Sequence, residues 1–140
     1  MFTLRFPVFG LVCTTLLVGC NNGPAELSKK NEVVSWSSLE DLRKPEIGMG
    51  IFRSAQMGDE ETLKKTLADP KVEEFVKAFE SDPIPKKYAS KAREDAKAAV
   101  VTEFKLLLST AKMGASFDDL KRSADALLQN IGKLTDPALK

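Results

Sequence analysis

The chain has 140 residues, of which 43% are hydrophobic and 29% are charged, so its length suits one domain with a single modest core. Its 21 basic and 20 acidic side chains nearly balance, which argues against the basic surface of a nucleic-acid-binding protein. The sequence contains no histidine, which excludes His-based acid–base catalysis, His-containing zinc sites and Ser-His or Cys-His nucleophiles.

The chain begins with a segment typical of an export signal. One positive charge, Arg5, precedes an uncharged run that extends to Gly19. This run has about 14 residues, whereas a helix needs roughly 20 to span a bilayer, and it contains Pro7 and Gly10. We therefore expect residues 1–19 to be a signal peptide and not a membrane-spanning helix.

The expected signal ends in Leu17-Val18-Gly19-Cys20, with a leucine three residues before a cysteine and small residues between them. This sequence resembles the lipobox of bacterial lipoproteins, and the resemblance covers the first 20 residues. It implies that Cys20 receives a diacylglyceryl group, that a peptidase cleaves before it, and that its new amino group is acylated. Several acyl chains anchor a protein stably, at about 0.8 kcal/mol per buried methylene. Cys20 is the predicted lipidation site and its lipid the predicted contact with a membrane.

The alternative is an ordinary secretory signal that is cleaved at another position. The small residue Gly19 and the polar residues 21–24 favour cleavage before Cys20. By resemblance to lipoproteins of two-membrane bacteria, asparagine at position 21 indicates the periplasmic side of the outer membrane, if the cell has two membranes. The predicted location is the bacterial cell envelope.

Cleavage before Cys20 changes the composition of the chain. It removes Cys13 and Arg5 and leaves 121 residues, with 20 basic and 20 acidic side chains and no formal net charge. Because lipidation consumes the Cys20 thiol, no disulfide is expected, and the domain must rely on its hydrophobic core.

Residues 20–37 are predicted to be the lipidated N-terminus and a flexible tether, because they are mostly polar and include Gly23-Pro24. Val33, Val34 and Trp36 break this pattern. We expect them to dock the end of the tether on the domain, and a contact of Trp36 with a ligand or a lipid interface is the alternative.

Residues 38–132 are predicted to form the helical bundle domain. The first helix, 38–58, should kink or restart at Pro45, which lacks a backbone N–H. Gly48 and Gly50 each weaken a helix by about 1 kcal/mol relative to alanine. Either another helix approaches closely at these glycines, or the helix is irregular there.

Residues 59–81 are predicted to form two short helices that meet at Asp69-Pro70, because aspartate caps a helix and proline suits its first position. A loop with two prolines follows. Residues 86–112 contain no Gly or Pro and should form the longest helix. Its first half is expected to bury an alanine stripe, which consists of Ala89, Ala92, Ala96 and Ala99.

The last helix is predicted over residues 117–132, after Gly114 and a capping box at Ser116. Its short connection to the preceding helix indicates an antiparallel hairpin. Residues 133–140 are expected to fray as a C-terminal tail. No segment alternates with period two for long enough to predict a strand, so the expected fold is an all-α, antiparallel bundle of four to five helices.

Three patterns could carry chemistry, and each has a simpler interpretation. The sequence from Ser109 to Lys112 matches the S-x-x-K pattern of penicillin-binding enzymes, whose further motifs are absent. Adjacent carboxylates point about 100° apart on a helix, so the acidic pairs indicate a solvated face and not a metal site. Met49, Met57 and Met113 are scattered, which favours core filling over copper or haem ligation.

The order of helices over residues 38–132 resembles the four-helix bundle of the cytochrome c-prime type. The haem attachment of that family, C-x-x-C-H, is absent, because residues 131–136 read Ile-Gly-Lys-Leu-Thr-Asp. The resemblance therefore implies no haem function.

These observations predict a lipid-anchored protein without a catalytic site, metal or cofactor, which acts as a structural or protein-binding module of the cell envelope. Its expected partners are the membrane and an envelope protein, and not nucleic acid. The exposed part of Gly48–Phe52 and Trp36 are the candidate partner surface. The alternative is a bundle that binds a small molecule or lipid, with the alanine stripe and the Gly48/Gly50 segment lining one cavity.

Overall fold

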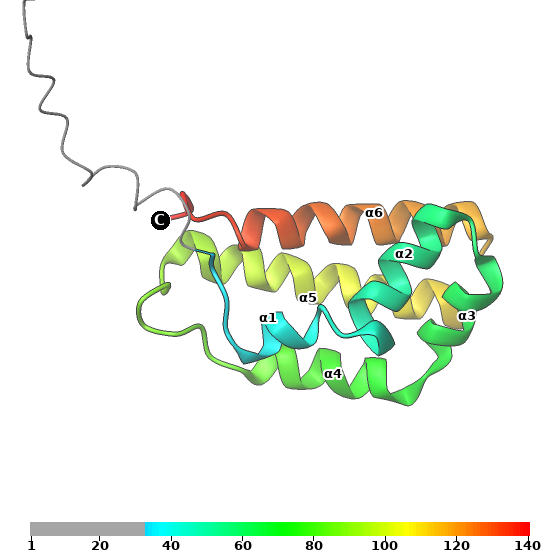
Figure 1. Cartoon of the computed structure of the whole chain (residues 1–140), viewed down its shortest axis with the longest axis horizontal. Coiled ribbons are helices and arrows are strands. Elements are labelled where there is room, and N and C mark those ends of the chain that lie inside the picture. The colour runs from blue at the N-terminus through cyan, green and yellow to red at the C-terminus, as the bar shows by residue number, and fades with distance from the viewer. Residues whose placement is uncertain (1–32) are drawn as a thin grey trace, which may run out of the picture. The chain divides into compact units, whose positions relative to one another are not determined.

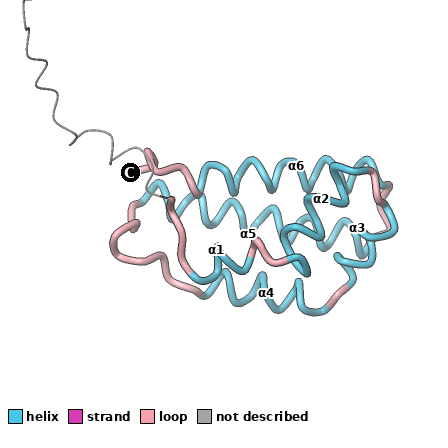
Figure 2. The backbone as a smooth tube through the Cα atoms, viewed as in Figure 1, coloured by secondary structure: helices cyan, strands magenta, loops and turns pink. Residues whose placement is uncertain are grey.

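The computed structural model describes residues 33–140. Every regular element in this part of the chain is a helix, and none is a strand (Figures 1 and 2). Residues 1–32, which include Cys20 and the predicted signal peptide, lie outside the described residues. The elements in chain order are α1 (Ser37–Asp41), η2 (Pro45–Met49), α2 (Gly50–Met57), α3 (Glu60–Ala68), α4 (Pro70–Ser81), α5 (Lys91–Lys112) and α6 (Phe117–Leu134).

The antiparallel hairpin of α5 and α6 forms the frame of the domain (Figure 1). Gly114 makes the turn possible because its φ of 73° is a left-handed conformation that residues with a Cβ rarely adopt. The Ser116 hydroxyl then accepts a hydrogen bond from the backbone N–H of Asp119 and caps α6. Both the hairpin and the all-α fold agree with the sequence prediction.

The first predicted helix is divided into three parts. Lys44, before Pro45, has an extended ψ of 141°, and the helix restarts at Pro45 as the π-helical segment η2. Gly48 lies against the carbonyl of Leu42, and a Cβ built on Gly50 would come within 3.3 Å of the Thr66 side chain of α3. Both expectations for the glycines are therefore met, because the helix is irregular and a neighbouring helix packs closely. This division gives six α-helices in residues 33–140 in place of four to five.

The predicted break at Asp69-Pro70 is confirmed. The Asp69 carboxylate accepts a hydrogen bond from the backbone N–H of Lys71, with Pro70 at the start of α4. Phe75 and Phe79 on α4 lie 5.8 Å apart between ring centroids, and Phe75 meets the edge of Phe104 of α5 at 5.9 Å. These rings form the contact between α4 and α5.

Helix α5 begins at Lys91, five residues later than the predicted Lys86. A turn closes first, with the N–H of Tyr88 donating to the carbonyl of Pro85, and Ser90 caps the helix. The predicted alanine stripe is also wrong, because Ala89 is exposed, Ala92, Ala96 and Ala99 are only half-buried, and Arg93 is buried in their place.

The C-terminal residues are held in place, contrary to the expected fraying. Helix α6 continues through Gly132 to Leu134, which is fully buried. The guanidinium of Arg93 then donates hydrogen bonds to the carbonyls of Asp136 and Leu139, at 2.7 and 2.8 Å. Because Tyr88 also donates through its hydroxyl to the carbonyl of Val33, both ends of residues 33–140 lie at one end of the bundle (Figure 1).

Glu73 links α4 to α5 and predicts an acid-dependent loss of stability. Its carboxylate pairs with Lys112 of α5 at 2.8 Å and with Lys77 at 3.3 Å, and these hydrogen bonds, that of Lys112 first, lower the Glu73 pKa. Because the folded pKa lies below the unfolded value, this contribution is present above the unfolded pKa and disappears as pH falls through the folded one. Urea unfolding between pH 7 and 3 should show a shallower acid dependence for Glu73→Gln than for wild type. Glu74→Gln is the matched control, and an equal change there would contradict the assignment.

Candidate functional site

A groove lies between the α1–α2 region and the C-terminal half of α6, and we call it the α2–α6 groove. Its volume is about 500 Å³. The lining residues are Leu39, Leu42, Arg43, Gly48, Met49, Phe52, Arg53, Gln56, Leu128, Ile131 and Thr135. Most of them are apolar. They come from α1, η2, α2 and α6, from the turn after α1, and from Thr135 just after α6.

The restart at Pro45 places two apolar side chains in the groove. Ile47 of η2 is buried, whereas Met49 is 49% exposed and Phe52 is half-buried. On the opposite wall, Leu127 of α6 is fully buried and its neighbour Leu128 is 37% exposed. An exposed apolar patch of this kind is typical of an interaction surface. Three residues of the Gly48–Phe52 segment line this groove, and the binding of a partner there stays a prediction.

The polar rim of the α2–α6 groove is basic. It contains Arg43 and Arg53 and no carboxylate. Neither guanidinium forms an ion pair within residues 33–140, and the Arg53 Nε–H points to the sulfur of Met57 at 3.4 Å. Both arginines can therefore take a carboxylate from a partner in bidentate geometry. This pair is not predictable from the sequence pattern, because the two arginines are ten positions apart, on opposite sides of η2.

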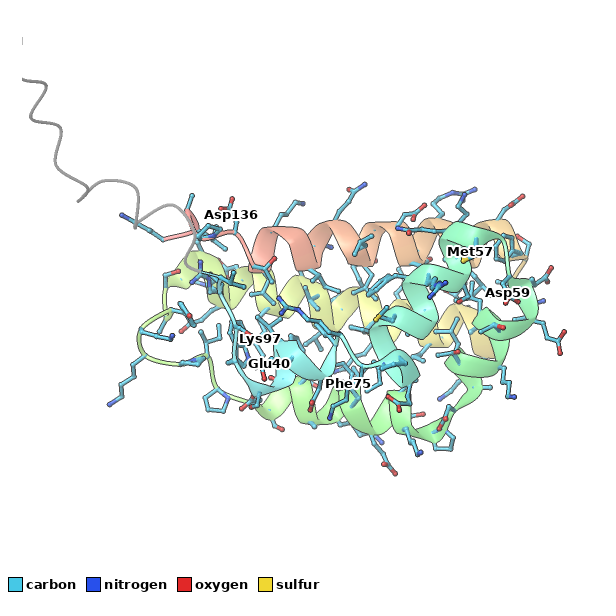
Figure 3. All side chains as sticks on the ribbon, in the orientation of Figure 1. Glu40, Met57, Asp59, Phe75, Lys97 and Asp136 are labelled. Atoms are coloured by element: carbon cyan, nitrogen blue, oxygen red, sulfur yellow. The ribbon has the colours of Figure 1, made fainter. Side chains whose placement is uncertain are left out.

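A second groove, of about 540 Å³, lies between the end of α4, the loop after it and α5, and we call it the α4–α5 groove. Pro83, Ile84 and Val101 supply apolar walls, and Lys97 and Lys105 supply ammonium groups. Lys97, which Figure 3 labels, donates hydrogen bonds to the backbone carbonyls of Glu80 and Asp82. Burial lowers the Lys97 pKa, and the nearby acidic side chains partly oppose this effect.

The two segments that were expected to line one cavity border different grooves. Ala89 and Ala98 line the α4–α5 groove, whereas Gly48 lines the α2–α6 groove.

The predicted docking of the tether's end is confirmed for two of three residues. Val34 and Trp36 are 3% and 7% exposed, whereas Val33 is 64% exposed. The Trp36 ring lies 6.2 Å from that of Tyr88, so it packs inside the domain and offers no surface to a ligand or lipid. Cys20, the predicted lipidation site, lies outside the described residues, so its lipidation stays a prediction. Within residues 33–140, none of the helices has the length and apolar character needed to cross a bilayer.

The other sequence candidates do not assemble into a site. Lys112 of the S-x-x-K pattern pairs with Glu73 across the α4–α5 contact, and Ser109 is exposed. Residues 33–140 bring no three Asp, Glu or Cys side chains together in a possible metal cluster. The expectation that methionines fill the core is wrong, since Met49, Met57 and Met113 are 49%, 70% and 75% exposed.

Comparison of the chain with known protein families, with curated proteins and with solved structures finds no match.

Proposed function

We propose that this protein is a lipid-anchored component of the bacterial cell envelope and that its helical domain is a non-catalytic protein-binding module. The observation that carries the proposal is the α2–α6 groove, which joins exposed apolar side chains to two unpaired arginines. The anchor is Cys20 of the lipobox-like sequence.

The proposed occupant of the α2–α6 groove is an amphipathic helix of an envelope protein with acidic residues beside its apolar face. Met49 and Leu128 offer adaptable apolar contacts, and methionine is common at such binding surfaces. Arg43 and Arg53 supply charge complementarity to an acidic partner, and the absence of carboxylates from the groove removes repulsion. A basic helix would bring positive charge against both arginines.

The tether sets how far the domain extends from the membrane. Twelve residues separate Cys20 from Val33, where the described chain begins, so an extended chain reaches about 45 Å at most. If the cell has two membranes, the proposed location is the periplasmic side of the outer membrane. The partner should then be within reach of a domain held on a tether of at most about 45 Å.

Replacement of Cys20 tests the anchor. The intact mass of protein from a membrane fraction should equal residues 20–140 plus acyl chains, and Cys20→Ser should leave the membrane fraction or stay unprocessed. Cys13→Ser is the matched control and should be lipidated normally, because Cys13 lies in the predicted signal peptide. Recovery of a cleaved wild-type chain without acyl chains would refute the anchor and leave the groove proposal standing.

Site-specific photo-crosslinking in cells tests the α2–α6 groove. A photoreactive residue at Met49 or Leu128 should yield a crosslinked partner, whereas one at Leu106, which is 51% exposed on α5, should not. The Arg43→Glu/Arg53→Glu double variant should lower the yield at least about tenfold, because it reverses both charges on the rim. Equal yields from Met49 and Leu106, or no effect of the charge reversal, would exclude this docking surface.

The α4–α5 groove favours small-molecule or lipid binding as a second candidate function. Its volume of about 540 Å³ lies within the range of ligand pockets, and it combines apolar walls with two lysines. Native mass spectrometry of wild-type protein from membranes should then show a noncovalent adduct, which Val101→Glu in the groove wall removes.

A further inference from the structure

Arg93 is a buried cation that lacks a buried anion. Its side chain is 3% exposed, and its guanidinium donates only to the carbonyls of Tyr88, Asp136 and Leu139. It forms no ion pair within residues 33–140, and the Asp136 carboxylate instead accepts from the backbone N–H of Ala138. The Arg93 Nε–H has no acceptor. Because arginine stays protonated, the site holds a full positive charge whose hydrogen bonds all go to neutral carbonyl oxygens.

A pocket of about 260 Å³ lies against this cation, and we call it the Arg93 pocket. Val34, Lys87, Tyr88, Ser90, Arg93 and Lys140 are among its lining residues, and none of the lining side chains is acidic. Lys140 also carries the terminal carboxylate of the sequence, which opposes the charge of its own ammonium group. The pocket lies at the N-terminus of α5, since Ser90 is the cap of that 22-residue helix. The positive end of the helix adds to the charges of the lysines and the arginine.

We propose that the Arg93 pocket binds a phosphate group. The combination of a buried guanidinium, lysine ammonium groups and a helix N-terminus is the chemistry that selects an oxyanion over water. The pocket lies at the end of the bundle that holds Asp136, which Figure 3 labels, and Val33, the first described residue, whose carbonyl accepts a hydrogen bond from Tyr88. The phosphate could therefore belong to an anionic lipid headgroup or to a free phosphate compound. The site itself depends on neither the α2–α6 groove nor the anchor.

Trp36 provides the measurement, because it is the only tryptophan of the chain and contacts Tyr88 in the pocket wall. Inorganic phosphate titrated into the full-length protein in detergent should change the Trp36 fluorescence saturably, and sodium chloride of equal ionic strength should not. Lys140→Glu, on the rim, should weaken phosphate binding at least about threefold, whereas Lys121→Glu, which makes the same charge change on α6 outside the pocket, should not. Arg93→Gln, if folded, should abolish the change.

Two kinds of nanodisc separate the sources of phosphate. If a lipid headgroup occupies the pocket, phosphatidylglycerol discs should suppress the phosphate response of the lipidated protein relative to phosphatidylcholine discs. An equal response in both discs would assign the pocket to a free phosphate compound. The absence of a saturable response, or equal affinities in Lys140→Glu and Lys121→Glu, would overturn the proposal and leave Arg93 as a structural link to the C-terminal residues.

Discussion

Phe104→Ala is expected to lower the free energy of unfolding by about 3–5 kcal/mol, because it removes a fully buried ring at the centre of the domain. Phe104 meets Phe75 edge to face at 5.9 Å between centroids, and Phe75 in turn packs on Phe79. The substitution therefore loses apolar burial and an aromatic contact and leaves a cavity between α4 and α5. Urea unfolding followed by circular dichroism measures the change.

Leu106→Ala is the matched control for Phe104. Leu106 lies two residues further along α5 and is 51% exposed, so its truncation should change stability by less than about 0.5 kcal/mol. A loss below about 1 kcal/mol for Phe104→Ala would mean that α4 and α5 do not pack through these rings.

Gly48→Ala should destabilise the domain by about 1–3 kcal/mol, although alanine normally favours a helix. A Cβ at this buried position would overlap the carbonyl oxygen of Leu42, which is backbone and cannot rotate away. Accommodation of the methyl group requires α1 and η2 to separate, which also alters the wall of the α2–α6 groove. Thermal unfolding of the full chain should therefore show a lower midpoint.

Gly132→Ala provides a control of opposite sign. Gly132 lies inside α6, and a Cβ built there meets no atom within 4 Å. The same chemical change should therefore stabilise the domain by up to about 1 kcal/mol. If both glycine variants moved stability in the same direction, the close approach at Gly48 would not be the cause.

The sequence predicts most helix boundaries because they depend on neighbouring residues. Asp69-Pro70 combines a cap with a first-turn proline, and Gly114 with Ser116 specifies the α5–α6 turn. The start of α5 differs from the prediction because residues 86–90 contain no Gly or Pro that would mark a break. The helix is delayed by a turn in which the N–H of Tyr88 donates to the carbonyl of Pro85. Local signals therefore located the break at Asp69-Pro70 and the α5–α6 turn. They did not show that the first helix divides into three parts, nor that the residues after α6 are held by Arg93.

The candidate sites were less predictable because their residues meet through the fold. Arg93 looks like a surface residue in sequence, and the carbonyls that bury it come from positions 43 and 46 residues away. The scattered positions of the methionines predict that Met49 fills the core, whereas at the end of the π-helical segment η2 it is 49% exposed. The irregularity at Gly48 and Gly50 was predictable because glycines weaken a regular helix, whereas a partner surface at Gly48–Phe52 stays a prediction.

The position at which the chain enters the domain has a mechanical consequence. A pull at Val33 acts first on Val34, Trp36 and the five-residue α1, because these segments precede the rest of the bundle. We expect the force to reach the longer α5–α6 hairpin only after α1 has detached from the rest of the bundle. Because Leu39 and Leu42 belong to both the α1 region and the α2–α6 groove, tension on the chain removes one wall of that groove before the hairpin opens. The α2–α6 groove is thus closer to a pull from the tether, along the chain, than the α5–α6 hairpin is.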